Sequence, residues 1–209
     1  MTIGFVNQKG GVGKTTLAVH CAYWLSKRGS VIVIDADAQQ SSSNWLKDLN
    51  LPCKVINDPE DILDILSVLP EKYDAVVVDG PGGMSEVTKA ILYGVDLALV
   101  PCKPSALDTH SSSRIIRMIR QSQKIRGGKP KAAMFLNQAV KGTLLLRDSL
   151  EMLKHFGFPY LNGVVYNRQV ICDAPGQGTT VWGLSGTAAQ AANKDFEAIF
   201  REVMEFAHE

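Results

Sequence analysis

The chain has 209 residues, which is enough for one α/β domain with a substantial core and too short for two ordinary ones. Its 22 basic and 21 acidic side chains give a net charge of +1, so the overall charge indicates no class of partner. Its four cysteines, Cys21, Cys53, Cys102 and Cys172, are far apart, which argues against a disulfide framework and a zinc site. With no recognisable signal peptide and no apolar run near the roughly 18 residues of a membrane span, we expect a cytoplasmic protein.

A glycine-rich loop near the N-terminus is the most informative stretch. An apolar run (residues 3–6) predicts a short buried strand before the loop, and a helix is predicted to begin near Lys14, which is the context that a phosphate-binding loop requires. The glycines let backbone N–H groups approach phosphate oxygens, and the helix N-terminus adds positive potential. We expect Lys14 to contact the β- and γ-phosphates and the Thr15 hydroxyl to ligate Mg²⁺. The predicted nucleotide-binding residues are Gly10, Gly11, Val12, Gly13, Lys14, Thr15 and Thr16; the alternative is a glycine-rich turn without a ligand.

Two later apolar runs each end in a carboxylate. Residues 31–34 and residues 75–78 predict buried parallel strands, which are followed by Asp35 and Asp37 and by Asp79 respectively. Open α/β sheets bind ligands at the C-terminal ends of their strands. Asp79 is therefore predicted to hold the Mg²⁺ shell, as in a Walker B strand. An alternative for Asp37 is that it caps a helix predicted over residues 39–46.

The remaining pattern alternates between strands and helices. Further strands are predicted over residues 53–56, 95–100, 132–137 and 163–166, and helices over residues 17–25, 59–69 and 188–207. The last helix carries phenylalanines on one side and mostly acidic residues on the other, so we expect it to pack on the sheet and not to bind a membrane surface. We predict one P-loop domain over residues 1–209, of the α/β class, with a doubly wound, mostly parallel sheet and helices on both faces.

A second lysine, Lys9, precedes the glycines of the loop. The stretch KGGVGKTT resembles the deviant Walker A motif of the ParA/MinD ATPases, a family of dimerising P-loop proteins. The resemblance extends over essentially the whole chain and implies ATP and Mg²⁺ as ligands. It also implies that Lys9 reaches the nucleotide of the partner subunit; the alternative is that Lys9 only adds positive charge near the phosphates.

The resemblance also assigns roles to later residues. In the segment DADAQ, Asp37 matches the family's aspartate that helps to position the attacking water, and Asp35 is an indirect Mg²⁺ group or a structural one. The family has proline at the position of Ala38. The catalytic residues implied are Lys9 and Asp37, and the metal site is implied to comprise Thr15, Asp37 and Asp79.

Two candidates for adenine binding follow from the same resemblance. Asn137, at the end of a predicted strand, matches the family's adenine-reading residue, and Pro175 lies in a segment (residues 173–178) that is similar to the adenine-side loop of ParA proteins. The alternatives are an ordinary asparagine at a strand end and an ordinary loop proline.

Basic residues are concentrated in one part of the chain. No acidic residue lies between Asp108 and Asp148, whereas nine lysines and arginines do. Four of them recur at spacings of three and four residues, so several should share one helix face that suits phosphate backbones. The candidate DNA-binding residues are Arg114, Arg117, Arg120 and Lys124. The alternative is a solvated helix face that is neutralised by acidic side chains elsewhere in the fold.

The function implied by the resemblance is that of a small ParA-type partition ATPase, located in the cytoplasm on the nucleoid. Such a protein forms an ATP-dependent homodimer on non-specific DNA, and a small adaptor protein stimulates its weak hydrolysis; the cargo is a plasmid, a chromosome region or a protein assembly. One alternative is a P-loop metabolic ligase of the dethiobiotin-synthetase type, against which Lys9 and the basic segment argue. Another is an iron–sulfur reductase resembling the nitrogenase iron protein, against which the absence of a suitable cysteine pair argues.

Overall fold

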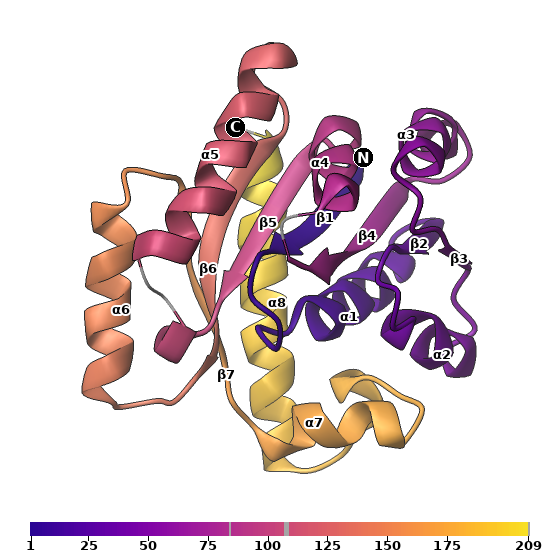
Figure 1. Cartoon of the computed structure of the whole chain (residues 1–209). Coiled ribbons are helices and arrows are strands. Elements are labelled where there is room, and N and C mark those ends of the chain that lie inside the picture. Colours follow the sequence, from indigo (N-terminus) through magenta and orange to yellow (C-terminus); the bar gives the residue numbers. More distant parts are fainter. Residues whose placement is uncertain (84, 107–108, 209) are drawn as a thin grey trace.

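A single seven-stranded sheet forms the centre of the protein, and helices cover both of its faces (Figure 1). The computed structural model describes residues 1–83, 85–106 and 109–208. The strand order is β3-β2-β4-β1-β5-β6-β7, and every neighbouring pair is parallel, which confirms the predicted fold class. The strands are Thr2–Asn7 (β1), Val31–Asp35 (β2), Cys53–Val55 (β3), Ala75–Gly82 (β4), Leu97–Cys102 (β5), Lys131–Ala139 (β6) and Tyr160–Tyr166 (β7).

The helices divide between two hydrophobic clusters, one on each face of the sheet. Along β2, Val31 and Val33 belong to one cluster, whereas Ile32 and Ile34 belong to the other, which explains why its sequence is continuously apolar. Residues of α1, α2, α7 and α8 contribute to the first cluster, and residues of α3, α4, α5 and α6 to the second. The helices are Lys14–Ser26 (α1), Ser41–Asp48 (α2), Pro59–Val68 (α3), Glu86–Gly94 (α4), Thr109–Ile125 (α5), Leu144–His155 (α6), Gln169–Gly176 (α7) and Thr187–His208 (α8).

The C-terminal helix α8 packs against the sheet, as predicted. Its residues Phe196, Ile199, Phe200 and Val203 are buried. The carboxylate of Glu202, on the side predicted to be acidic, accepts hydrogen bonds from the backbone N–H groups of Asn162 and Gly163 in the edge strand β7, at 2.6 and 2.7 Å. Across the described part of the chain, no helix has both the length and the apolar character needed to cross a membrane.

One predicted loop is wrong. Residues 173–176, expected in a loop, form the last turn of α7, and Pro175 lies inside that helix. A proline normally disrupts a helix because it lacks an N–H group and clashes with the preceding turn. Here Pro175 is one residue from the end of α7, so only the last turn is affected, and the N–H group of Gln177 closes the helix on the carbonyl oxygens of Asp173 and Ala174.

Candidate functional site

The glycine-rich loop connects β1 to α1 at the C-terminal edge of the sheet (Figure 1). Gly13 is the N-cap of α1 with φ 88°, a left-handed conformation that favours glycine, and a Cβ atom there would collide with the amide of Asn137. Among the described residues no side chain caps this helix N-terminus, and its first turn contains no acidic residue. Its N–H groups and positive dipole end therefore suit an anionic ligand such as phosphate.

Two side chains near the end of β6 form hydrogen bonds with the loop backbone. The side-chain amide of Asn137 donates a hydrogen bond to the Val12 carbonyl oxygen at 2.7 Å, and that of Gln138 donates one to the Gly11 carbonyl oxygen at 3.1 Å. These two side chains hold the loop backbone in place. Gln138 was not predicted, because the strand was expected to end at Asn137, whereas β6 continues to Ala139.

Lys14 is nearly buried at the start of α1. Its Nζ atom donates a hydrogen bond to the Lys9 carbonyl oxygen at 3.3 Å, within the loop itself. Burial lowers the pKa of Lys14, and the nearby carboxylates of Asp79 and Asp37 oppose that shift. The structure thus brings the predicted phosphate-contacting lysine and two of the predicted carboxylates into one site.

Asp79 lies at the centre of this site and is fully buried. It is in register with Asp35 on the neighbouring strand. Burial raises the pKa of Asp79 to about 7, and the negative charge of Asp35 adds to the shift, whereas the hydroxyls of Thr15 and Ser42 and the Lys14 ammonium group oppose it.

The surroundings of Asp79 fit a divalent cation. Neither of its carboxylate oxygens, nor the Ser42 hydroxyl, has a hydrogen-bond partner with acceptable geometry among the described residues. Buried oxygen atoms without partners are costly, and Mg²⁺ takes oxygen ligands. Thr15 and Asp79, both predicted from the sequence, therefore have the chemistry and the placement to hold Mg²⁺, and Ser42 is an additional oxygen that sequence analysis missed.

Asp35 and Asp37 differ in what they contact. The Asp35 carboxylate accepts hydrogen bonds from the backbone N–H groups of Ser43, at 2.8 Å, and of Asp37, at 3.2 Å, so it fixes the start of α2. Asp37 is not the cap of α2, since that helix begins at Ser41 after Gln40. Instead, the Asp37 carboxylate accepts a hydrogen bond from the Gln39 N–H group at 3.0 Å within a turn.

A cavity of about 350 Å³ brings most of the predicted phosphate site together. Asp37 lines it together with the loop, and Gly82, at the end of β4, was not predicted. The lining residues are Gly10, Gly11, Gly13, Lys14, Thr15, Thr16, Asp37, Gly82 and Gln138.

A second cavity, of about 440 Å³, adjoins the first, because Thr16 and Gln138 line both. Asn137 and Pro175 lie in this second cavity, so the structure brings the two predicted adenine contacts together. The other polar residues of this cavity were not predicted, among them Lys103, Tyr166 and Arg168. Tyr166 is the last residue of β7, and Arg168 follows two residues later. Both could have been predicted as Asp79 was, because ligands bind at the C-terminal ends of parallel strands.

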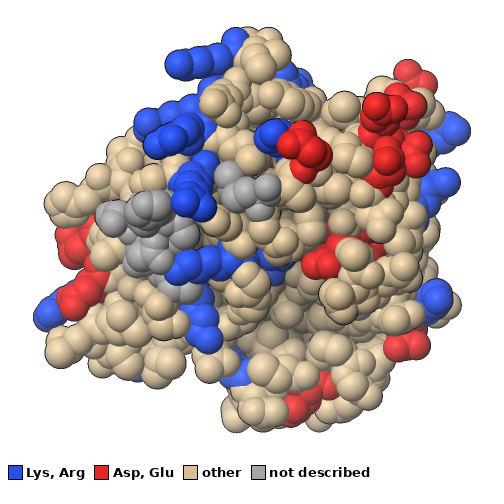
Figure 2. Space-filling model, in the orientation of Figure 1, with Lys and Arg blue, Asp and Glu red and all other residues tan. Residues whose placement is uncertain are grey.

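The four candidate DNA-binding residues are all exposed on α5. Arg120 donates a hydrogen bond to the Gly157 carbonyl oxygen at 3.0 Å. Within residues 1–83, 85–106 and 109–208, no acidic side chain lies at ion-pair distance from Arg114, Arg117, Arg120 or Lys124. Figure 2 shows lysines and arginines gathered in a band over α5, whereas acidic residues gather over α3 and α6. The predicted basic face is therefore not neutralised by described neighbours.

Other basic residues of the same segment serve the fold. Arg126 donates to the carbonyl oxygens of Leu92, at 2.9 Å, and Val95, at 2.6 Å. Lys129 pairs with Asp96 at 2.9 Å. These contacts remove part of the acid-free segment from the candidate DNA-binding surface.

Comparisons with known proteins identify the family and the fold. The family described as "CobQ/CobB/MinD/ParA nucleotide binding domain" matches residues 3–181. Maintenance of carboxysome distribution protein A of Halothiobacillus neapolitanus is 31% identical over 209 residues, which cover 97% of this chain and 96% of that protein. Chromosome-partitioning ATPase Soj of Thermus thermophilus is 24% identical over 217 residues, with 86% of each chain covered. The solved structure of apo McdA from Cyanothece has a TM-score of 0.78 at 17% identity and covers 97% of this chain and 98% of its own, a likeness of fold.

Proposed function

The chain belongs to the CobQ/CobB/MinD/ParA family of nucleotide-binding proteins, and on this basis we propose that it is an ATPase that positions a cargo along DNA. In this proposal ATP binding produces a homodimer that binds DNA without sequence preference. A small adaptor protein on the cargo then stimulates hydrolysis, which releases the DNA. Within the family, the ParA and MinD members are ATPases, and the Soj relative carries that activity in its name.

The phosphate cavity supports ATP as the ligand and Mg²⁺ as its counter-ion. Lys14 contacts the terminal phosphates in this proposal, and the Thr15 hydroxyl and Asp79 hold the cation. The supporting observation is that the oxygens of Asp79 have no hydrogen-bond partner with acceptable geometry in the part of the chain that the structure describes. The cation would neutralise charge on the phosphates. Asp37 positions the attacking water, which is supported by its place in the cavity wall and by its absence from the cap of α2.

Lys9 and the adenine contacts complete the proposed site. Lys9 acts on the nucleotide of the partner subunit, so the site of each subunit is complete only in the dimer. Asn137 and Pro175 contact the adenine ring from the cavity that adjoins the phosphate cavity. The Asn137 Nδ2 atom already donates one hydrogen bond to the Val12 carbonyl oxygen, and its second N–H and its Oδ1 atom are the groups proposed to contact the base.

The exposed cations of α5 are the observation that carries the DNA-binding part of the proposal. They face solvent without acidic partners in the described part of the chain, and phosphate backbones bind such surfaces by releasing counter-ions. A dimer places two of these surfaces on one duplex, so the weak contacts of one subunit become strong by avidity. The metabolic ligase remains the alternative. Its reaction requires neither the exposed cations of α5 nor Lys9.

The test is DNA binding at several salt concentrations with and without ATP. If each subunit neutralises about three phosphates, the slope of log affinity against log salt is about −5, from roughly −0.9 per contact. Neutralising Arg117, Arg120 and Lys124 together by alanine substitution should flatten the slope and weaken binding to all sequences alike. The matched control neutralises Lys47, Lys54 and Lys72, which are exposed on other elements.

Two outcomes would contradict the proposal. Full affinity and slope in the α5 triple variant would show that α5 does not bind DNA. Turnover of a small metabolite without any DNA binding would favour the ligase.

A further inference from the structure

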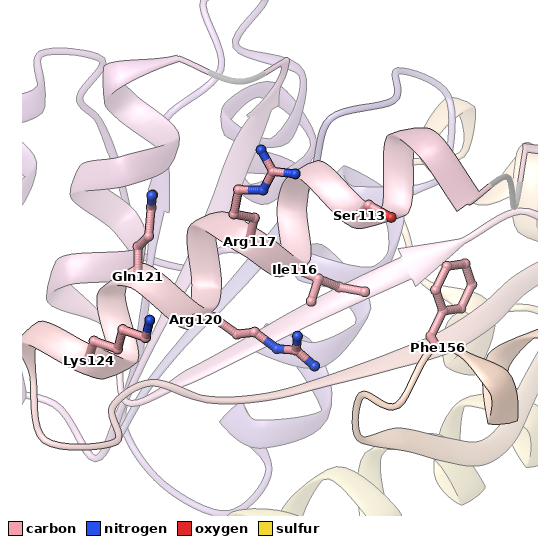
Figure 3. A pocket seen from close by; sticks show the side chains of 7 residues that line it. All are labelled: Ser113, Ile116, Arg117, Arg120, Gln121, Lys124 and Phe156. Carbon is pink, nitrogen blue, oxygen red and sulfur yellow. The ribbon is translucent and has the colours of Figure 1, made fainter.

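A cavity of about 410 Å³ lies between α5 and the end of α6, away from the phosphate loop. Figure 3 shows the side chains that frame it. Arg117, Arg120 and Lys124 supply three cations from α5, and Phe156 supplies an aromatic ring from the residue after α6. Ser113, Ile116 and Gln121 complete the lining. None of these residues lines the cavities at the phosphate loop.

The positive charge of this cavity is not cancelled from α6. The two acidic residues of α6 are exposed, but Asp148 pairs with Arg147 at 3.2 Å and Glu151 pairs with Lys154 at 2.8 Å. Arg120 is held across the cavity by its hydrogen bond to the Gly157 carbonyl oxygen. A guanidinium group that is already held in place loses less conformational entropy when it binds an anion.

The cavity has Phe156 at one end and Lys124 at the other, and the Arg120 guanidinium lies between them (Figure 3). Phe156 lies at the end nearest to Ile116 and Ser113, and Gln121 and Lys124 lie at the other end (Figure 3). Arg117 and Lys124 are separated by about 10 Å along the helix, from a rise of 1.5 Å per residue. That length suits a chain of phosphate groups better than a single phosphate, and the neighbouring ring suits a planar, stackable group.

We propose that this cavity is a second nucleotide-type site, which binds a ligand with several phosphates at one end and a planar ring at the other. The phosphates contact Arg117, Arg120 and Lys124, and the ring packs against Phe156 above Ile116. The occupant uses the cations that the proposed function gives to DNA, so it would compete with DNA. The binding itself does not depend on the proposed function.

The test uses Lys14→Ala in EDTA, so that the phosphate loop contributes little, and measures binding by isothermal titration calorimetry. The probes are ADP, inorganic tripolyphosphate and adenosine. We expect ADP and tripolyphosphate to bind with one-to-one stoichiometry and adenosine not to bind. Adding Phe156→Leu, which keeps an apolar side chain but removes the ring, should weaken ADP about two- to tenfold and leave tripolyphosphate unchanged.

The charged end is tested separately. Lys124→Ala should weaken both phosphate-bearing probes about tenfold, because each loses a charge-assisted hydrogen bond. Lys141→Ala is the matched control: it removes the same charge from an exposed residue outside the cavity and should change neither affinity.

Three results would overturn the proposal: no ADP binding to the Lys14→Ala protein, equal effects of Lys124→Ala and Lys141→Ala, or equal weakening of ADP and tripolyphosphate by Phe156→Leu. The effect of Phe156→Leu on ADP separates this proposal from the proposed function, because the proposed function gives Phe156 no role in DNA binding.

Discussion

His20 should make the stability of the protein depend on pH. It is fully buried in α1, where its ring stacks on Phe196 with 4.2 Å between centroids and an interplanar angle of 3°. Its Nδ1 atom donates to the Thr16 carbonyl oxygen at 2.7 Å, and its Nε2 atom accepts a hydrogen bond from the Val181 N–H group at 3.3 Å. This pattern requires the neutral tautomer with hydrogen on Nδ1. Burial lowers the pKa of His20 to about 4.

The direction of the effect follows from the two pKa values. Below about pH 6.5 the imidazole of the unfolded chain binds a proton, whereas the folded protein binds one only near pH 4. The contribution of His20 to stability is therefore complete above pH 6.5, and it falls as the pH decreases from 6.5 to 4. A difference of about 2.5 units at 1.36 kcal/mol per unit corresponds to about 3 kcal/mol of unfolding free energy.

The assay is urea unfolding, followed by tryptophan fluorescence, at pH values from 7 to about 4.5. His20→Phe keeps the stacking and removes the titration, and at pH 7 it should cost about 1–3 kcal/mol because it leaves the Thr16 carbonyl and the Val181 N–H unpaired. Its free energy should then fall less steeply with pH than that of the wild type. Other groups that titrate in this range are present in both proteins and cancel in the difference. The control is His155→Phe, since His155 is exposed on α6. Identical pH dependence in the wild type and His20→Phe would refute the reasoning.

Three substitutions test the proposed ATP site. Lys14→Ala should abolish Mg²⁺-dependent ATP binding at the phosphate loop, because the loop otherwise offers mainly backbone donors to the phosphates, and should leave only the binding proposed for the α5 cavity; unchanged Mg²⁺-dependent affinity in a binding titration would contradict the assignment. Lys9→Gln should bind ATP but hydrolyse it roughly 10³- to 10⁵-fold more slowly and dimerise weakly, because a cation supplied by the partner is lost; wild-type hydrolysis by a strictly monomeric variant would disprove action across the dimer. Asp37→Ala should bind ATP and accumulate as a dimer in size-exclusion chromatography, since water positioning is lost while Lys14, Thr15 and Asp79 remain; a monomer with normal turnover would exclude the proposed role.

The sheet was predictable because its strands are buried on both faces. The sequences of β2 and β4 are unbroken apolar runs that lead to an aspartate. Such runs are typical of parallel strands that are buried on both faces of a sheet. The loop predicted around Pro175 was wrong, because this residue lies inside α7. Proline next to glycine favours a loop in any local reading, but the helix α7 that contains it is held by long-range packing, since Ala174 is buried in the core.

The carboxylates of the site were predictable for the same topological reason. Parallel strands deliver their C-terminal residues to one edge, so Asp35 and Asp79 had to lie close together. What they bond to was not predictable. Asp35 is engaged by backbone N–H groups at the start of α2, whereas neither oxygen of Asp79 has a partner among the described residues. That difference depends on the path of the chain after β2. The pattern of an apolar run that ends in an aspartate does not predict this path.

The partners of the basic residues were also not predictable from the sequence. They determine how strongly DNA affinity should depend on salt. Helical spacing singles out four of the nine lysines and arginines between Asp108 and Asp148, but the sequence does not show which of the nine have partners in the fold. Their partners distinguish them: Arg126 and Lys129 bind residues at the end of α4 and in the turn before β5, and Lys131 donates to carbonyl oxygens at the end of α8. If all nine bound phosphates in both subunits of a dimer, the slope of log affinity against log salt would be about −16; with the three cations of the α5 variant it is about −5. A measured slope therefore reveals how many basic residues the fold leaves for DNA.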